Sequence, residues 1–85
     1  MYIVYSKPNC PQCDQAKMLL DMKGEKYNVI HLDVGQPKQD NTKYISRDEL
    51  IKKIPTAKMM PQIVKQESTG EQYIGSYQEL RKLIA

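Results

Sequence analysis

The chain of 85 residues contains no Phe and no Trp, and it has only two Cys and a single His. The bulk of its core therefore has to come from six Tyr, five Met and the aliphatic side chains. No run of about 18 apolar residues is present, so the sequence predicts no transmembrane helix. No basic segment followed by an apolar one opens the chain, so we expect no signal peptide. The length of 85 residues predicts one small domain, residues 1–85, and without either segment we expect it in the cytoplasm.

The net charge of +3 is small and unevenly distributed. Residues 1–42 carry five Lys against four Asp and one Glu, which gives zero. Residues 43–85 carry six Lys and two Arg against one Asp and four Glu, which gives +3. A basic half attracts anions, but so small an excess does not argue for nucleic-acid binding, and an ordinary solvated surface explains it better. We therefore expect a soluble protein that binds neither nucleic acid nor a membrane.

The two cysteines, Cys10 and Cys13, lie only three positions apart. A disulfide across two intervening residues closes almost no loop, so it barely restricts the unfolded chain. Disulfide-stapled secreted domains also carry more cysteines at wider spacing. A closed zinc site needs four ligands, whereas this chain offers two Cys and His31, which lies in a predicted strand. The pair is better placed for redox chemistry, and a metal cluster shared between two chains is the alternative.

Apolar periodicity predicts the element order β-α-β-α-β-β-α. The first β-α-β unit requires parallel strands joined by a right-handed crossover, and the last two strands form a hairpin. We therefore expect an α/β fold in which three helices flank a mixed sheet of four strands. The polar segment 35–43 is expected to be an exposed loop. The predicted strands cover residues 2–5, 27–34, 61–66 and 71–75, and the predicted helices begin near residues 11, 46 and 76.

The second and third predicted helices begin with a Ser that is followed three residues later by Glu, which is the capping-box pattern. The apolar side chains of these two helices that we expect to face the core are Leu50, Ile51, Ile54, Leu80, Leu83 and Ile84.

Cys10 follows the first predicted strand, and the first helix begins at Pro11. A sulfur there faces the unpaired amides and the positive dipole end of the helix. Cysteines in such places have pKa values of about 3.5–7.5 instead of about 8.5. We therefore expect Cys10 to be exposed and to attack disulfides, and Cys13 to face inward and resolve the mixed disulfide. Lys7 adds positive charge nearby or is an ordinary surface lysine.

Three segments resemble the glutaredoxin family. Residues 6–13, Ser-Lys-Pro-Asn-Cys-Pro-Gln-Cys, look like the active-site segment of dithiol glutaredoxins, whose usual form is C-P-Y-C. Residues 59–63, Met-Met-Pro-Gln-Ile, resemble the T-V-P-x-I segment, and residues 74–80, Ile-Gly-Ser-Tyr-Gln-Glu-Leu, resemble I-G-G-x-x-D/E-L. The resemblance covers essentially the whole chain and implies the thioredoxin fold. The short length and the long loop after the second strand resemble phage-type or bacterial small glutaredoxins; a phage protein would work in the host cytoplasm.

The resemblance implies roles for individual positions, with Cys10 and Cys13 as the attacking and resolving thiols. Pro61 is the implied cis-proline that faces the disulfide and presents the Met60 backbone to glutathione, although a strand-initiating proline fits the sequence as well. The implied glutathione-binding residues are Lys7, Gln12, Met59, Met60, Pro61, Gly75, Ser76, Tyr77 and Gln78.

Each implied contact has a physical reason. Lys7 would meet a glutathione carboxylate, and Gly75 would let the backbone approach the ligand closely. The amides of Tyr77 and Gln78 would hold the γ-glutamyl carboxylate, because helix starts bind anions. The alternative is that the segment from Ser76 onward only caps a helix.

Four of these positions depart from the family pattern. Gln12 replaces the usual Tyr, and Met59 replaces the usual Thr. Ser76 replaces the second Gly, and Gln78 stands where many members have Asp. Glutathione would then bind more weakly or differently, whereas disulfide exchange would be unchanged in kind.

The implied activity is that of a glutathione-linked thiol-disulfide oxidoreductase that reduces protein disulfides and glutathione mixed disulfides. Glutathione would be the reducing cosubstrate, with no bound cofactor and no metal. Disulfide-containing proteins such as ribonucleotide reductase are the implied clients, and we expect a monomer. One alternative is a redoxin recharged by thioredoxin reductase, which Pro11 and Lys7 disfavour. Another is a dimeric carrier of an iron–sulfur cluster or metal, a role usual for single-Cys C-G-F-S glutaredoxins.

Overall fold

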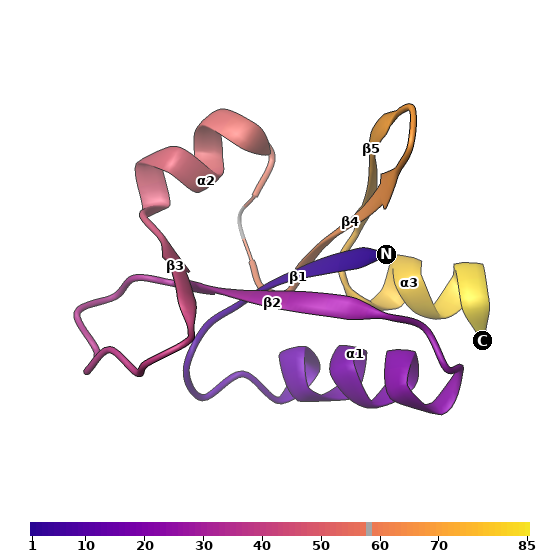
Figure 1. The fold of residues 1–85 in the computed structure, drawn as a ribbon, viewed down its shortest axis with the longest axis horizontal. Helices are drawn as coiled ribbons and strands as arrows, with labels where there is room; N and C mark the ends of the chain where they lie inside the picture. Colours follow the sequence, from indigo (N-terminus) through magenta and orange to yellow (C-terminus); the bar gives the residue numbers. More distant parts are fainter. Residues whose placement is uncertain (58) are drawn as a thin grey trace.

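A computed structural model describes residues 1–57 and 59–85 of the chain (Figure 1). One mixed sheet has the strand order β3-β2-β1-β4-β5. The central strand β1 is parallel to β2 and antiparallel to β4, and β4 forms a hairpin with β5. The predicted α/β class, the three helices and the mixed sheet are confirmed. In chain order the elements are β1 (Tyr2–Ser6), α1 (Pro11–Met22), β2 (Tyr27–Leu32), β3 (Lys43–Ile45), α2 (Arg47–Lys53), β4 (Gln62–Glu67), β5 (Gly70–Gly75) and α3 (Tyr77–Ile84).

The expected number of four strands is wrong, because β3 adds a fifth at the sheet edge, parallel to β2. It begins at Lys43, where the expected polar loop ends. Ile45 of this strand is buried against the α2 side of the sheet. Three residues are too few to show a strand pattern in the sequence. Strand β2 is also shorter than expected, since it ends at Leu32 and Val34 is 58% exposed.

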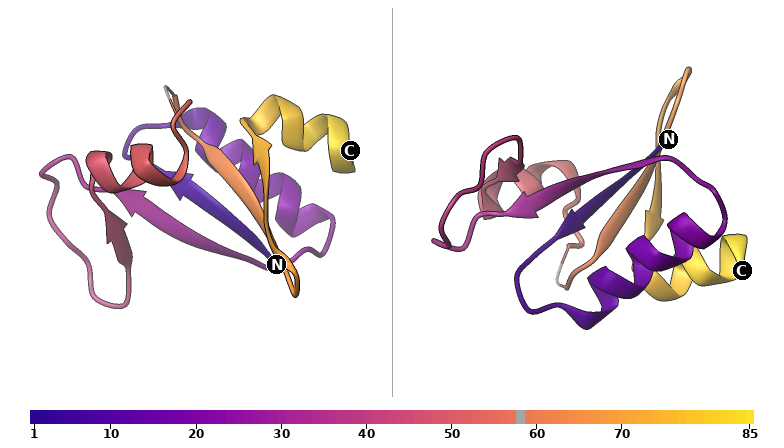
Figure 2. Two further views of the ribbon diagram at one scale, coloured as in Figure 1. Left: turned by 90° about the horizontal axis from the view of Figure 1, so that it is seen from above. Right: turned by 60° about the horizontal axis from the view of Figure 1, so that its bottom comes forward.

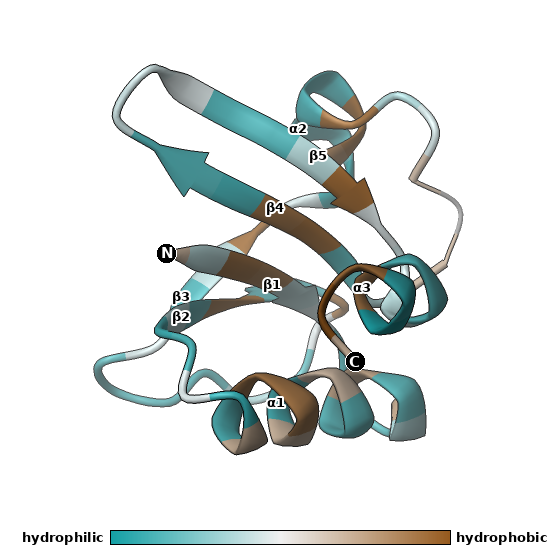
Figure 3. Ribbon diagram, turned by 90° about the vertical axis from the view of Figure 1, so that its right-hand side faces the viewer, coloured by the Kyte–Doolittle hydropathy of each residue, from teal (hydrophilic) through white to brown (hydrophobic). Residues whose placement is uncertain are grey.

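Helices α1 and α3 lie side by side on one face of the sheet, and α2 covers the other face (Figures 1 and 2). Successive side chains of β1 point to opposite faces, so this strand contributes to both cores. Tyr2 and Val4 pack with α1 and α3, whereas Ile3 and Tyr5 pack with α2. Figure 3 shows the hydrophobic residues of β1 and β4 in the middle of the sheet. The sheet is therefore covered on both faces, and its strand ends are left for the site.

Two of the predicted core positions are wrong. Leu50, Ile54 and Leu80 are buried, but Ile51 is 40% exposed and Leu83 is 56% exposed. In helices of seven and eight residues, only a narrow stripe at i, i+4 spacing reaches the sheet. Leu50 of α2 and its C-cap residue Ile54 form that stripe, so Ile51, about 100° away around the helix, faces outward. In α3 the stripe runs from Leu80 to the half-buried Ile84 and leaves Leu83 outside it.

The two Ser residues before α2 and α3 cap their helices differently. The Ser46 Oγ accepts a hydrogen bond of 3.1 Å from the Glu49 amide, which confirms this part of the first capping box. The Ser76 Oγ accepts no amide hydrogen bond and instead donates one of 2.6 Å to Glu79 Oε2. The second capping box is therefore wrong in its amide contact, although Ser76 does precede the first turn of α3.

Replacement of the two cap residues tests this difference. We expect Ser46→Ala to lower the free energy of unfolding by about 1 kcal/mol, because the Glu49 amide loses its acceptor. Ser76→Ala is the matched control, and its effect should stay within about 0.5 kcal/mol. Urea denaturation of the three proteins measures both values. Equal losses for the two variants would contradict the assignment.

Candidate functional site

The predicted site segments meet at one end of the sheet. The end of β1 leads into the turn before α1, and Tyr5 pairs with Gln62 at the start of β4. Gly75 at the end of β5 pairs with Ile63. The turn before α1, the Met59–Pro61 segment and the start of α3 therefore lie at neighbouring strand ends, although they are far apart in the sequence.

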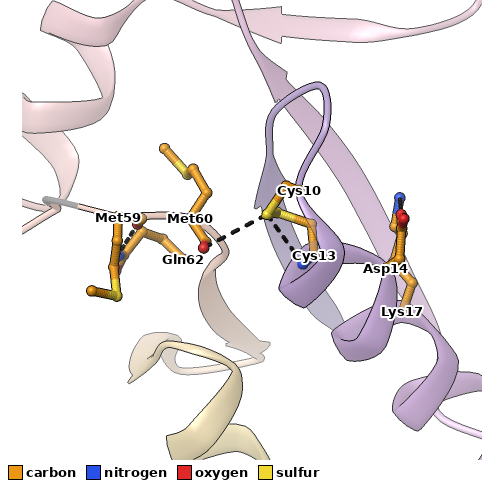
Figure 4. Close-up of a disulfide and its surroundings, with 7 residues drawn as sticks. All are labelled: Cys10, Cys13, Asp14, Lys17, Met59, Met60 and Gln62. Atoms are coloured by element: carbon orange, nitrogen blue, oxygen red, sulfur yellow. Dashed lines mark hydrogen bonds and ion pairs between the residues drawn. A yellow bond between two sulfur atoms is a disulfide. The ribbon is translucent and has the colours of Figure 1, made fainter.

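Cys10 and Cys13 form a disulfide across the first turn of α1, with their α-carbons 5.3 Å apart (Figure 4). Asn9 has a positive φ of 55°, a conformation that Asn tolerates better than most residues, and it turns the chain into the helix. Cys10 is the N-cap residue of α1, and its Sγ accepts a hydrogen bond of 3.2 Å from the Cys13 amide. The helix entrance therefore presents a donor to this sulfur.

The two sulfurs differ in accessibility less than we expected. Cys10 is only 8% exposed with the disulfide closed, and Cys13 is 1% exposed. The expectation of an exposed Cys10 is therefore wrong for the disulfide form, because the sulfur packs between the helix entrance and Met60. Cys10 is nevertheless the more accessible of the two and lines an open hollow.

Met60 places a second polar group beside Cys10. Its carbonyl oxygen lies 3.7 Å from Cys10 Sγ (Figure 4). The Met60–Pro61 peptide bond is cis, as the resemblance implies, and Pro61 is fully buried. Met59 lies on the surface at 60% exposure. The sulfur thus lies between an amide donor, which stabilises a thiolate, and a carbonyl dipole, which disfavours one.

Two depressions adjoin this centre and share Lys7. The Arg47 recess has a volume of about 100 Å³ and is lined by Lys7, Arg47, Met59 and Met60, among others. The His31 hollow, of about 380 Å³, is lined by Cys10 together with Lys7, Asp14, Lys17, His31 and Tyr44, among others. Lys17 forms an ion pair of 3.4 Å with Asp14. Both depressions therefore offer positive charge close to the disulfide.

Sequence reasoning missed Arg47 and gave no role to Gln62. Arg47 is the first residue of α2 and reaches the same recess as Lys7. No spacing pattern links these two residues, since β2 and β3 separate them in the chain. Gln62 is only 3% exposed, which is rare for a Gln. Its position directly after Pro61 was the only available signal.

The start of α3 carries the remaining predicted residues. Gly75 has a φ of +120°, and a Cβ there would lie 3.0 Å from Glu79 Cγ, so only glycine fits without a shift. Ser76 and Tyr77 are half-buried, and Gln78 is exposed. Gln12 is exposed as the second residue of α1. The structure thus brings Lys7, Met59 and Met60 into one recess, and it places Ser76, Tyr77 and Gln78 at the neighbouring strand end.

In the described part of the chain, no group of three or more His, Cys, Asp or Glu side chains is placed to hold a metal ion. No helix among residues 1–57 and 59–85 has the length and apolar character needed to cross a bilayer.

Glu79 is the acidic group nearest to the start of α3. The hydrogen bond from the Ser76 hydroxyl holds the pKa of Glu79 below its ordinary value. The ionised form therefore stabilises the fold at pH values above the ordinary Glu pKa, and this stabilisation is lost as the pH falls through the folded value. We expect Ser76→Ala to raise the pKa of Glu79, as measured by NMR titration of its carboxyl carbon.

Asp33 is the internal control in this titration, because Lys38 lowers its pKa independently of Ser76. An unchanged pKa of Glu79 in Ser76→Ala, or an equal shift of Asp33, would contradict the assignment.

Comparison with known proteins agrees with this geometry. The glutaredoxin family profile matches residues 2–68. A curated protein named Glutaredoxin from Ricinus communis is 52% identical over 31 residues, which cover 36% of this chain and 30% of that protein. The alignment thus spans less than a third of the length of this relative. Because the family match extends over most of the chain and includes both cysteines and Pro61, the chain belongs to the glutaredoxin family.

Proposed function

We propose that the protein is a thiol-disulfide oxidoreductase that reduces protein disulfides and glutathione mixed disulfides, with glutathione as its reducing cosubstrate. The observation that carries the proposal is the hydrogen bond from the Cys13 amide to Cys10 Sγ at the entrance of α1. A donor at a helix N-terminus favours the thiolate, and the thiolate is the form that attacks disulfides.

The reaction begins when the Cys10 thiolate attacks one sulfur of a client disulfide. A new S–S bond joins Cys10 to the client, and the other client sulfur leaves as a thiolate that takes a proton from water. Cys13 then loses its proton and attacks Cys10 Sγ, which releases the second client thiol and closes the Cys10–Cys13 disulfide. The α-carbon separation of 5.3 Å lies within the range for this bond.

Two molecules of glutathione then restore the dithiol. The first attacks Cys10 Sγ, so that Cys13 leaves and a glutathione mixed disulfide forms at Cys10. The second attacks the glutathione sulfur of that mixed disulfide and releases glutathione disulfide and the Cys10 thiolate. In sum, one client disulfide is reduced to two thiols, and two glutathione molecules are oxidised to one disulfide. The Cys13 amide stabilises Cys10 each time that Cys10 leaves as a thiolate.

The residues around Cys10 support glutathione as the reductant. The Arg47 recess carries two cationic side chains, Lys7 and Arg47, which suit a carboxylate. The Met60 backbone lies beside Cys10 and offers a peptide edge for the backbone of glutathione. At the start of α3, the amides of Tyr77 and Gln78 are at the positive end of a helix dipole. The Arg47 recess and the start of α3 bind the two ends of glutathione, and the Met60 backbone binds its middle, while its sulfur is bonded to Cys10.

The proposal extends to the setting of the protein. We propose a monomer in the cytoplasm, where glutathione keeps thiols reduced. Ribonucleotide reductase is a client to be tested first, since it needs a dithiol donor in each turnover.

A coupled assay with glutathione, glutathione reductase and NADPH tests the reductant. We expect NADPH oxidation with a glutathione mixed disulfide and with a protein disulfide. Cys13→Ser should keep turnover on the mixed disulfide and lose at least about tenfold on the protein disulfide, because the resolving step is missing. Cys10→Ser should lose both activities.

Two outcomes would contradict the proposal. Substantial activity of Cys10→Ser would show that the nucleophile is wrongly assigned. Turnover with thioredoxin reductase but not with glutathione would identify a redoxin recharged by a flavin enzyme.

A further inference from the structure

Two side-chain hydrogen bonds in series hold the Met59–Pro61 segment, which faces Cys10. The Gln62 Nε2 donates to the Met59 carbonyl oxygen over 2.6 Å. The Gln62 Oε1 accepts from the Tyr73 hydroxyl, also over 2.6 Å. Gln62 is 3% exposed, and both ends of its amide are paired within the described residues. The dashed line from Gln62 to Met59 in Figure 4 marks the hydrogen bond of this series that is nearer to Cys10.

The direction of each hydrogen bond is fixed by chemistry. A backbone carbonyl only accepts, so the nitrogen of the Gln62 amide must face Met59. The amide oxygen then faces Tyr73, and the Tyr73 hydroxyl must donate. Gln62 thus has one arrangement that satisfies both partners, and a buried amide that lost either of them would be left unpaired.

The register of the β4–β5 hairpin places Tyr73 beside Gln62. The pairs from Glu67–Gly70 to Val64–Tyr73 keep one register, so Tyr73 lies opposite Val64. Paired residues point to the same face of a sheet, and Gln62, two residues before Val64, points to that face too. A bulge at Ile74 shifts only the next pair, Ile63 with Gly75. Tyr73 and Gln62 are therefore diagonal neighbours on the face of the sheet covered by α2.

We propose that Tyr73 and Gln62 are positioning residues for the reaction at Cys10. Through the Met59 carbonyl they fix the next peptide, whose carbonyl oxygen lies 3.7 Å from Cys10 Sγ. The negative end of that carbonyl opposes the thiolate, while the Cys13 amide favours it. Tyr73 and Gln62 thereby keep the pKa of the Cys10 thiol higher than the helix entrance alone would set it.

The same two hydrogen bonds affect the binding of glutathione, and this part of the inference rests on the proposed function. The Met60 backbone is the proposed contact for the backbone of glutathione. When the hydrogen bonds of Gln62 are lost, the Met60 backbone is less ordered and has to become ordered when glutathione binds. The affinity for a glutathione mixed disulfide should therefore fall, while the catalytic step is largely kept.

The experiment compares Tyr73→Phe with its parent in the Cys13→Ser background, where Cys10 is the only thiol. Ultraviolet absorbance of the thiolate gives the pKa of Cys10, and the glutathione-coupled assay gives KM and kcat. We expect the pKa to fall by about half a unit, because the Met60 carbonyl can turn away from the charge. We expect KM for a glutathione mixed disulfide to rise about three- to tenfold, with kcat changed less than about twofold.

Gln62→Met is the second variant, since it removes both hydrogen bonds at similar side-chain volume, and its shifts should be at least as large. Tyr27→Phe is the matched control, because it removes a Tyr hydroxyl that bonds Asp21 away from the site. A pKa of Cys10 that is unchanged in folded Tyr73→Phe and Gln62→Met would overturn the positioning role. An equal shift in Tyr27→Phe would overturn it too.

The two proposals fail separately in this design. Absence of glutathione-linked turnover in the wild-type protein would reject the proposed function. The pKa of Cys10 in the Tyr73→Phe protein is measured without any substrate, so it would still decide whether Tyr73 and Gln62 position the sulfur.

Discussion

The hydrogen bond from the Cys13 amide to Cys10 Sγ is the interaction on which the proposed chemistry of this chain depends. It exists because Cys10 is the N-cap of α1 and Cys13 lies three residues later. A Ser or Asp in that position would cap the helix as well, but only a thiolate combines capping with nucleophilic attack. One hydrogen bond therefore both caps the start of the helix and stabilises the thiolate, the form in which the sulfur attacks and leaves. The backbone conformation of Asn9 and the end of β1 hold that helix entrance at the edge of the sheet.

The rest of the site is arranged around this sulfur by the sheet. Because β1 lies between β2 and β4, the turn before α1 is next to the Met59–Pro61 segment that leads into β4. The Met60 carbonyl then opposes the Cys13 amide from the other side of the sulfur. Two cationic side chains line the Arg47 recess, and the start of α3 lies at the neighbouring strand end.

The local parts of this arrangement could be predicted from the sequence, and the parts that depend on strand register could not. The spacing of Cys10 and Cys13 and the Ser46 cap are fixed by residues within one helical turn, so the sequence predicts them directly. Arg47 reaches the site only because β3 pairs with β2, and three strand residues leave no pattern to read. Tyr73 meets Gln62 because the β4–β5 register pairs Tyr73 with Val64, two residues from Gln62 on the same face, and the predicted hairpin did not specify that register. Leu83 failed as a core residue because the sequence shows apolar spacing but not the width of the covered face.

The most direct test of the central claim is the site of alkylation in the reduced protein. At mildly acidic pH an ordinary thiol with a pKa of about 8.5 is almost fully protonated and reacts slowly. Limiting iodoacetamide should therefore modify Cys10 and leave Cys13 free, as located by fragment-ion mass spectrometry of the peptide that contains both residues. Modification of Cys13, or equal labelling of the two cysteines, would show that the helix entrance does not select the nucleophile.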